Sequence, residues 1–261
     1  MPLIPIRTIN EAVKYLKAGN LVIYPTETAY ALGADPANSR AVRAIFSVKN
    51  RPAGRPLPLI AASLIMAQQW ARFTPAVRSL ARRYWPGPFT LVLPSRRRLA
   101  RGVVAPDGTV ALRVSGSRTA RSISRALGRP IISTSANQSG HGNSYSPTSI
   151  RQQFGNSAAT IFFFSSGRLP RRCSSTVVRV QGESVTLLRQ GRVRVKLKSK
   201  KLKVKSESKN LKVTTRLQGA YRQNFLLLNF GSTLLSVRLR LTRSPIMSLS
   251  NDNFCLLHFN F

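Results

Sequence analysis

Four groups of cationic, hydroxyl and amide side chains have the types and spacing that chemistry on phosphates requires. The groups are residues 24–33, Lys49 with Arg51, Arg113, and the hydroxyl-rich run 133–140. Preorganised cations and hydrogen-bond donors stabilise the negative charge that develops when a phosphate is attacked. The pattern therefore favours chemistry that works through cations and hydroxyls.

Other reaction classes lack their residues. His141 and His258 are the only histidines, and no aspartate is placed to orient either one, which disfavours a Ser-His-Asp hydrolase. The chain contains neither the phosphate-binding loop of P-loop enzymes nor a dinucleotide fingerprint. Cys173 and Cys255 form no C-x-x-C pair, which argues against a zinc site or a disulfide framework. No metal site formed by protein ligands is expected.

Each group also has a simpler interpretation. Lys49 and Arg51 would suit a solvated helix end, where cations are favoured by the helix dipole. Arg113 would suit a pair with a carboxylate, and Ser133, Ser135 or Asn137 would cap the following turn. Against this, open α/β sheets bind ligands where strands end and such residues follow.

The charge balance is strongly basic, with 42 Lys and Arg against 7 Asp and Glu and a net charge of +35. Such a balance predicts a phosphate-rich partner, either nucleic acid or nucleotide, although an arginine-rich proteome or a non-native segment would also produce it. The longest apolar stretch, 225–237, is interrupted and shorter than the ~20 residues that span a bilayer. Without a signal-peptide pattern, we expect a cytoplasmic protein with no membrane association.

Composition changes near residue 195. From Lys196 onward the chain has eight lysines and five arginines, and residues 196–205 alternate charged and apolar side chains without a turn signal. We expect a catalytic domain over residues 5–193 and a basic tail over 196–261. The tail is expected to be irregular, either disordered or a non-native extension, and the alternative is a basic arm that binds RNA.

Local patterns predict a mixed α/β domain. Thr8 to Glu11 form a capping box before a helix that Gly19 ends, and Asn38 caps a second helix running to about Lys49. Further helices are expected in 63–83 (one or two), 117–127 and 147–154. Strands are expected at 21–24, 57–61, 89–93, 110–114, 131–135, 161–164 and 176–180, the last forming a hairpin with 185–189. We expect these strands to form one mixed sheet.

Six motifs, read in order, resemble the YrdC-like domain of TsaC/YrdC-type threonylcarbamoyl-AMP synthases. They are Tyr24-Pro25-Thr26-Glu27-Thr28, Lys49-Asn50-Arg51-Pro52, Trp85-Pro86-Gly87-Pro88-Phe89-Thr90, Val110-Ala111-Leu112-Arg113-Val114, the run Ser133 to Gly140, and Leu188-Arg189-Gln190-Gly191. The resemblance implies a single α/β YrdC-like domain with a twisted mixed sheet and flanking helices.

The resemblance also implies an activity. Family members form threonylcarbamoyl-AMP from L-threonine, bicarbonate and ATP and release pyrophosphate, with Mg²⁺ expected to accompany ATP. A separate transferase complex then modifies tRNA. Carried over by position, the nucleotide-binding residues are Lys49, Arg51, Thr109, Ser135, Asn137 and Arg189, of which Lys49 and Arg51 are catalytic. The threonine-binding residues are Thr28, Arg113 and Ser133, with Arg113 gripping the carboxylate as a fork.

Three positions depart from the family pattern. Ala31 adds a methyl where glycine is usual, Ser115 replaces a frequent proline, and the stretch 140–146 is longer than usual. Two alternatives remain open. One is a non-catalytic RNA-binding protein of rRNA or tRNA maturation that contacts tRNA or duplex RNA through its basic face. The other is a carbamoyl-handling domain of a larger enzyme, which the missing zinc-finger cysteines disfavour.

Overall fold

A computed structural model describes residues 3–52, 55–157, 159–182 and 184–195, together with four short strands between residues 225 and 259. By its internal contacts the chain divides into two units, Met1–Val204 and Lys205–Phe261. The candidate site residues all belong to the first unit. The expected boundary between a domain at 5–193 and a tail at 196–261 stays a prediction.

Four helices of the first unit begin where the sequence predicts. Thr8 caps α1 and completes a capping box with Glu11, and Asn38, Ser117 and Ser146 cap α2, α5 and α6. The segment 63–83 forms two helices. The bounds are α1 Ile9–Lys17, α2 Ser39–Val48, α3 Leu64–Trp70, α4 Pro75–Tyr84, α5 Arg118–Leu127 and α6 Pro147–Phe154.

The strands form two mixed sheets, where the sequence predicts one. The first has the order β1-β9-β2-β3-β8 and the second β11-β10-β5-β6-β4-β7. The first sheet contains β1 Leu3–Ile6, β2 Leu21–Pro25, β3 Tyr30–Gly33, β8 Thr134–Ser135 and β9 Ile161–Phe164. The second contains β4 Leu59–Ala61, β5 Phe89–Pro94, β6 Thr109–Val114, β7 Ile131–Ile132, β10 Thr176–Gln181 and β11 Ser184–Arg189. The α/β class is confirmed.

Two strand predictions are corrected. The sequence predicts no strand directly after Thr28, but Tyr30–Gly33 form β3, which pairs antiparallel with β2. A glycine is needed at position 33 of this strand, because a Cβ there would lie only 2.5 Å from Cε1 of Tyr24. The predicted strand 131–135 divides at Ser133, so that β7 pairs with β4 in the second sheet and β8 with β3 in the first. This segment therefore connects the two sheets.

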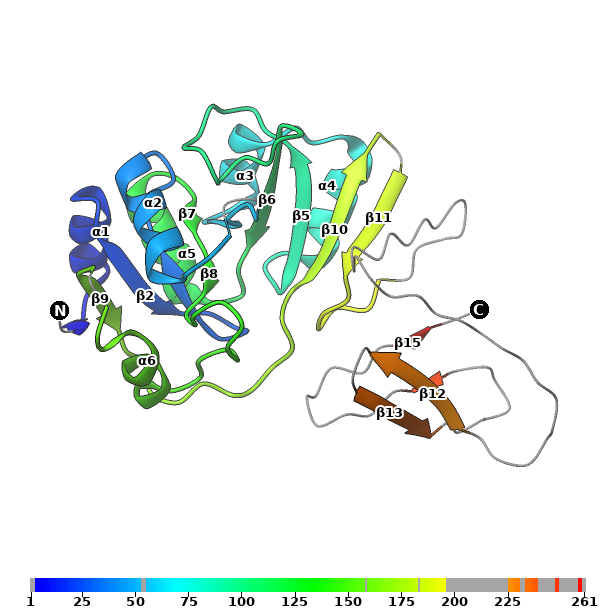
Figure 1. Ribbon diagram of the computed structural model, residues 1–261. Helices are drawn as coiled ribbons and strands as arrows, with labels where there is room; N and C mark the ends of the chain where they lie inside the picture. Colours follow the sequence, from blue (N-terminus) through cyan, green and yellow to red (C-terminus); the bar gives the residue numbers. More distant parts are fainter. Residues whose placement is uncertain are drawn as a thin grey trace. The chain divides into compact units, whose positions relative to one another are not determined.

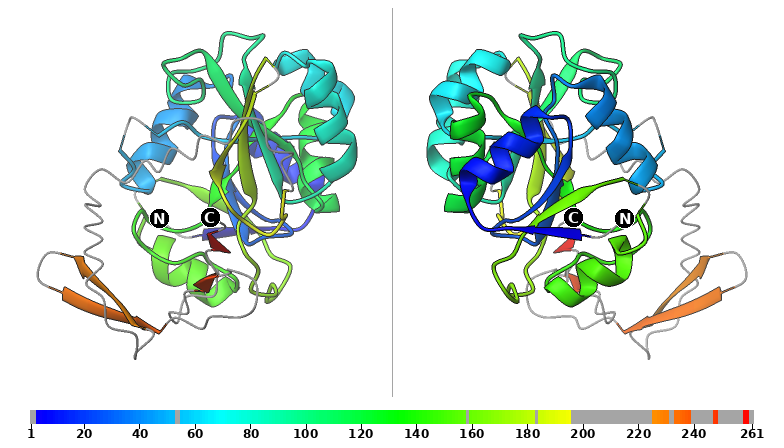
Figure 2. Two further views of the ribbon diagram at one scale, coloured as in Figure 1. Left: turned by 90° about the vertical axis from the view of Figure 1, so that its right-hand side faces the viewer. Right: turned by 90° about the vertical axis from the view of Figure 1, so that its left-hand side faces the viewer.

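Apolar side chains pack into two clusters on opposite faces of the first sheet. Ile23 and Leu32 face the larger cluster, which includes residues of α2, α3, α4 and α6. Val22 and Tyr24 face the smaller one, formed with α1 and α5. Figures 1 and 2 show α3 and α4, in cyan, against the second sheet, whereas α1 and α5 lie beside the first. Helix α5 packs on both sheets because it contacts β2, β4 and β7.

The second unit contains four described strands. Strand β12, Phe225–Phe230, pairs antiparallel with β13, Thr233–Arg238, and β14, Met247–Ser248, pairs with β15, His258–Phe259. These short strands occupy a small part of the tail that the sequence predicts to be irregular. The rest of that prediction lies outside the described residues.

Candidate functional site

The turn between β2 and β3 is fixed by its own hydroxyl groups. Thr26 Oγ1 donates to the carbonyl oxygen of Ala29 at 2.6 Å and lies 3.0 Å from Thr28 Oγ1. Ser117 Oγ, from the cap of α5, donates to the carbonyl oxygen of Pro25 at 2.9 Å. The turn is thus held from within and attached to the start of α5, which gives Thr28 a defined position.

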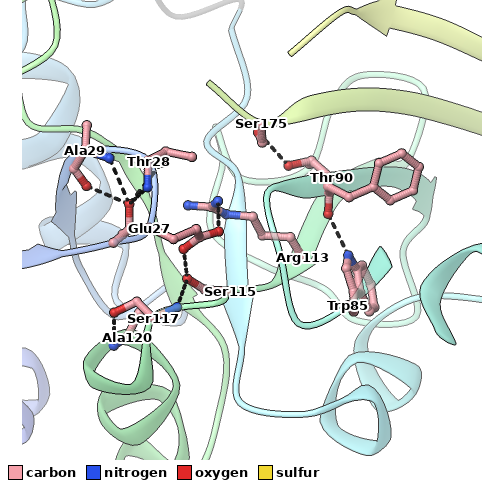
Figure 3. A network of polar contacts seen from close by, with 12 residues as sticks. Glu27, Thr28, Ala29, Trp85, Thr90, Arg113, Ser115, Ser117, Ala120 and Ser175 are labelled. Carbon is pink, nitrogen blue, oxygen red and sulfur yellow. Dashed lines mark hydrogen bonds and ion pairs between the residues drawn. The ribbon is translucent and has the colours of Figure 1, made fainter. Parts of the chain in front are cut away.

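A buried ion pair joins this turn to the second sheet. Nη1 of Arg113 lies 2.7 Å from Oε1 of Glu27, and the two side chains are 9% and 11% exposed. The hydroxyl of Ser115 donates to the other carboxylate oxygen, as Figure 3 shows. Burial alone would raise the pKa of Glu27, but Arg113 and the hydrogen bond from Ser115 outweigh it and hold the pKa below its ordinary value. Glu27 is therefore a carboxylate at neutral pH.

The register of the second sheet places a row of side chains on the face that carries Arg113, because residues paired across strands share a face. Ile60 pairs with both Arg113 and Ile131, and these two isoleucines pack in the cluster formed with α5. On the other side of Arg113, the pairing of Leu91 with Leu112 brings Thr90 beside it. The row is thus apolar beneath α5 and polar beyond it.

The polar half of the row ends at Arg189. Thr90 pairs with Val177, and Val177 pairs with Arg189. The Thr90 hydroxyl donates to Ser175 Oγ at 3.0 Å, a contact drawn in Figure 3. Nη2 of Arg189 donates to the same Oγ at 3.0 Å and to the Ser175 carbonyl oxygen at 2.9 Å. Thr90 and Ser175 therefore lie between two of the predicted site arginines.

The loop after Arg189 packs tightly against this edge. A Cβ on Gly191 would lie 2.2 Å from the carbonyl oxygen of Ser174, so only glycine fits. The Thr176 hydroxyl accepts from the backbone nitrogens of Gly191 and Val193, each at 3.1 Å. The glycine of the Leu-Arg-Gln-Gly motif thus lets the chain approach the Ser175 backbone, to which Arg189 is bound.

Lys49 owes its inward position to the way α2 ends. Asn50 is left-handed, with φ of 47°, and the backbone nitrogen of Arg51 donates to Phe46 at 3.0 Å. The nitrogen of Asn50 donates to Ser47 at 3.0 Å, which completes a Schellman motif. The helix therefore stops before Pro52, and Lys49 becomes its C-cap.

The Lys49 ammonium is buried and bound by oxygen atoms of the run that follows β8. The residue is 2% exposed, and Nζ donates to the carbonyl oxygen of Ser135 at 2.6 Å, to that of Asn137, and to Asn137 Oδ1 at 3.4 Å. Burial, and secondarily Arg51, lowers the pKa of Lys49 to about 7. The prediction of a solvated helix end is therefore wrong for Lys49.

The neighbours of Lys49 fix the rest of this cluster. Ser135 Oγ donates to Asn137 Oδ1, and Asn137 Nδ2 donates to the carbonyl oxygens of Gln138 and His141. The Arg51 guanidinium donates to the carbonyl oxygens of Arg55 and Pro56, at 3.1 and 3.3 Å. Burial also lowers the pKa of Arg51.

Eight of the nine predicted site residues lie in or beside two clusters, which we name by their cations. The Lys49 cluster contains Lys49, Ser135 and Asn137, with Arg51 on the adjoining loop, and the Arg113 cluster contains Glu27, Thr28, Arg113 and Ser115. Arg189 lies beside the Arg113 cluster, at the far end of the row that also carries Thr90, and it is bound to Ser175. Ser133 lies where the chain passes from β7 to β8, two residues before Ser135, and its side chain hydrogen-bonds Tyr24. Each cluster combines guanidinium or ammonium groups with hydroxyls.

Thr109 is the exception. It begins β6, whereas Arg113 lies four residues further along the strand, roughly 13 Å away at the rise of a β-strand. Its hydroxyl donates to Asp107 Oδ1 at 2.6 Å, and Asp107 is paired with Arg179 at 3.0 Å. The structure therefore separates Thr109 from Arg113 by the length of β6 and binds its hydroxyl to Asp107.

The departures from the family pattern have structural explanations. The Ala31 methyl is 4% exposed and packs in the smaller apolar cluster, so it does not face a ligand. Ser115, in place of proline, supplies the hydroxyl that binds Glu27. In the longer stretch, Ser144 is fully buried and its carbonyl oxygen accepts from the Tyr30 nitrogen at 3.1 Å. Its backbone therefore supports β3.

Two hollows lie elsewhere on the first unit. One groove is lined by Gln68, Arg72, Phe73, Arg78, Ser95 and Arg96, and a second by Pro75, Arg78, Ser79, Arg82 and Arg83. The second lies along α4, and the first shares Arg78 with it. Among the described residues, no three or more His, Cys, Asp or Glu side chains gather as a metal site would require.

The sequence pattern of the Sua5/YciO/YrdC family, described as "Telomere recombination", matches residues 14–191. A threonylcarbamoyl-AMP synthase of Vibrio vulnificus is 34% identical over 189 residues, which cover 71% of this chain and 100% of that protein. The chain belongs to the Sua5/YciO/YrdC family. A synthase of the same name from Thiobacillus denitrificans is 40% identical over 142 residues, 54% of this chain and 76% of that protein. The resemblance inferred from the motifs is confirmed.

Solved structures of the Sua5/YciO/YrdC family agree with the fold. Sua5 of P. abyssi, solved in complex with L-threonine, superposes with a TM-score of 0.66 at 33% identity over 73% of this chain. The match spans 58% of the length of that protein. YciO of E. coli, at 23% identity, gives a TM-score of 0.65 over 75% of this chain and 97% of its own length, which supports the fold alone.

No helix in the part of the chain that the structure describes has the length and apolarity needed to cross a membrane.

Proposed function

We propose that this chain is a nucleotidyltransferase that forms threonylcarbamoyl-AMP from L-threonine, bicarbonate and ATP. The observation that carries the proposal is the buried Lys49 ammonium, which is bound by carbonyl and amide oxygens instead of a carboxylate. No carboxylate in the described part of the chain therefore neutralises its positive charge. Family membership, with a full-length match to a synthase of this name, supports the same activity.

The Arg113 cluster is the proposed threonine site. Glu27 engages Nη1 of Arg113, so the remaining guanidinium nitrogens would donate to the α-carboxylate of threonine. Thr28, on the turn that carries Glu27, and Ser133 would hold the rest of the amino acid. These hydroxyls lie on elements fixed by Ser117 and Tyr24, which gives the site the rigidity that orientation requires.

The Lys49 cluster is the proposed nucleotide site. Lys49 and Arg51 would bind phosphate oxygens, Ser135 and Asn137 would donate to the nucleotide, and Arg189 would approach from the end of the polar row. We leave Thr109 out because it lies at the far end of β6. Arranged this way, the two clusters bring an amino acid and a triphosphate toward the Thr90–Ser175 pair between Arg113 and Arg189.

The proposed reaction needs positioning more than a protein base. The threonine nitrogen joins the carbon of bicarbonate with loss of water, and an oxygen of the resulting carbamate attacks the α-phosphorus of ATP. The bond from that phosphorus to pyrophosphate then breaks. Lys49 and Arg51 would stabilise the negative charge on the phosphate oxygens as it increases, while Arg113 holds the amino acid in line.

We propose that Mg²⁺ takes no ligand from the described acidic residues. The Glu27 carboxylate is occupied by Arg113 and Ser115, and Asp35 accepts from the Ala37 nitrogen at 2.9 Å and lies 3.8 Å from Arg129. Any Mg²⁺ would therefore arrive on the phosphates of ATP. We assign it no protein ligand.

The test is pyrophosphate release from ATP by the full chain, measured with threonine and bicarbonate present together and with each omitted. We expect release only when both are present. Release that is indifferent to threonine would show that the chain catalyses a different reaction.

A second candidate function, RNA binding, is favoured by the two arginine-lined grooves that share Arg78. Arg78 and Arg96 are oriented by donating to the carbonyl oxygens of Phe73 and Gln68, each at 3.1 Å. Oriented guanidinium groups suit the phosphates of tRNA or duplex RNA. Such binding would place the product near the tRNA that a downstream transferase complex modifies, and it implies a cytoplasmic location, where tRNA is found.

This candidate is tested by the salt dependence of tRNA affinity. Replacing Arg72 and Arg96 with glutamine should lower the slope of log affinity against log salt by about 1.5, because each lost phosphate contact removes ~0.7–0.9. The matched control replaces Arg118 and Arg125 of α5. Equal losses in both double variants would mean that net charge, and not the grooves, binds the RNA.

A further inference from the structure

The Glu27 carboxylate is held more tightly than an ordinary ion-pair partner. Oε1 accepts from Arg113, Oε2 accepts from Ser115, and the backbone nitrogen of Gly116 also hydrogen-bonds the group. Its side chain packs against the Cα of Gly116, where a Cβ would lie 3.4 Å from Cγ of Glu27. The carboxylate is therefore fixed on the β6–α5 connection.

This arrangement sets the orientation of Arg113. A guanidinium is planar, so a 2.7 Å contact at Nη1 with a fixed carboxylate determines which edge of the plane faces outward. Glu27 belongs to the turn that carries Thr28, whose hydroxyl lies 3.0 Å from that of Thr26. Glu27 thus connects the two sides of the proposed threonine site.

The pair also sets the local charge. Arg113 and Glu27 together are neutral, and both side chains are about nine-tenths buried, where screening by solvent is weak. A ligand with one carboxylate can bind the outward edge of Arg113. Once the first carboxylate is bound, Arg113 faces two carboxylates with a single positive charge. A second carboxylate on the same ligand would then be repelled by the negative charge of Glu27.

We propose that Glu27 is a positioning and specificity-determining residue, which orients Arg113 toward a single α-carboxylate and excludes amino acids that carry a second one. The inference rests on the proposed function, because it assigns the Arg113 cluster to the amino acid. Discrimination against aspartate then comes from an unfavourable charge contact with the wrong substrate. Glu27 itself need not touch threonine.

The experiment compares E27Q and E27D with wild type, using pyrophosphate release with threonine or aspartate as the amino acid. E27Q keeps the size of the side chain and removes its charge, whereas E27D keeps the charge and withdraws it by one methylene. We expect E27Q to raise the KM for threonine ~10-fold and to leave the KM for ATP within about twofold. The ratio of kcat/KM for aspartate to kcat/KM for threonine should increase by ~10-fold or more. E27D should raise the KM for threonine yet still reject aspartate.

The matched control is D35N, which removes another buried acid whose partner is Arg129. D35N should leave the KM values for threonine and ATP, and the preference for threonine over aspartate, unchanged. Thermal unfolding of each variant separates misfolding from a site effect, and E27D carries the test if E27Q does not fold. Unchanged threonine KM and discrimination in E27Q, or equal changes in both KM values, would overturn the role of Glu27 alone. Threonine-independent release by wild type would instead overturn the proposed function, and this inference with it.

Discussion

Nζ of Lys49 lies 2.6 Å from the carbonyl oxygen of Ser135, although Lys49 caps helix α2 and Ser135 ends strand β8. The contact joins two predicted site residues that are 86 positions apart in sequence. It also buries an ammonium group without a carboxylate beside it. The chain therefore holds a positive charge where the proposed reaction needs one.

Lys49 and Arg51 are expected to be essential for turnover. Removing either cation by K49A or R51A should lower kcat ~100-fold or more, as loss of a preorganised donor does in other enzymes. The assay is pyrophosphate release at saturating substrates. K17A, at an exposed lysine of α1, is the control and should behave as wild type. Near-normal turnover in either site variant would reject the catalytic role.

The pKa of Lys49 predicts a pH dependence. Burial lowers that pKa to about 7, so the fraction of free protein with a protonated ammonium decreases as pH rises through 7. If phosphate binding needs the protonated form, kcat/KM for ATP should decrease about tenfold per pH unit well above 7. K49R should remove the decline, because a guanidinium stays protonated. If kcat/KM for ATP declined identically in K49R, the titrating group would be a residue other than Lys49.

The same lowered pKa has a consequence for stability. The unfolded chain keeps the Lys49 proton up to its ordinary pKa near 10.4, whereas the folded chain loses it near 7. Between these values the unfolded state binds more protons, so this group makes the free energy of unfolding increase with pH. Denaturant unfolding of wild type and K49M at pH 7 and pH 9 checks the sign. The increase in the free energy of unfolding from pH 7 to pH 9 should be smaller in K49M than in wild type. A larger increase in K49M would contradict the burial of the Lys49 charge.

Gly191 is expected to control the position of Arg189. In G191A the new methyl would collide with the Ser174 carbonyl and the Thr176 nitrogen, at 2.2 and 2.5 Å, and one of the two backbone segments must move. Overpacking of this kind costs about 1–3 kcal/mol. We expect a lower free energy of unfolding together with a higher KM for ATP. G142A is the control, since a Cβ at Gly142 meets nothing within 4 Å. If G191A were as stable and active as wild type, the close approach would be absent.

The Thr90 hydroxyl is expected to support nucleotide binding through Ser175. T90V preserves the shape of the side chain but removes the donor to Ser175 Oγ, which also accepts from Arg189. A lost hydrogen bond of about 0.5–1.5 kcal/mol corresponds to an increase in the KM for ATP of roughly 2- to 12-fold. T90S should restore the wild-type value. An unchanged KM in T90V would exclude Thr90 from the site.

The sequence predicts elements whose signals are local. Thr8 with Glu11, and Asn38, mark helix starts through contacts within three residues, and the structure confirms them. By contrast, Tyr30–Gly33 became a strand because β2 and β8 pair with it on either side. The division of β7 from β8 at Ser133 likewise follows from pairing with two different sheets. Such long-range pairing has no signature in a single sequence.

The candidate site divides in the same way. Cations and hydroxyls were visible as motifs, yet the partner of Arg113 is Glu27, 86 positions away, and neither motif specifies the other. Thr90 and Ser175 were missed because their role depends on the register between β5 and β10. Thr109 was included because of its position along the chain, although the length of β6 separates it from Arg113.

The central claim is that the Arg113 cluster binds the amino acid and the Lys49 cluster binds the nucleotide, and equilibrium titration tests it most directly. Wild type, R113K and K49M would each be titrated with threonine and with ATP, R113K keeping a charge beside Glu27 while losing the guanidinium fork. The account predicts a crossed result, in which R113K loses threonine affinity and keeps ATP affinity while K49M does the reverse. Parallel loss of both ligands in both variants, or no loss in either, would contradict it.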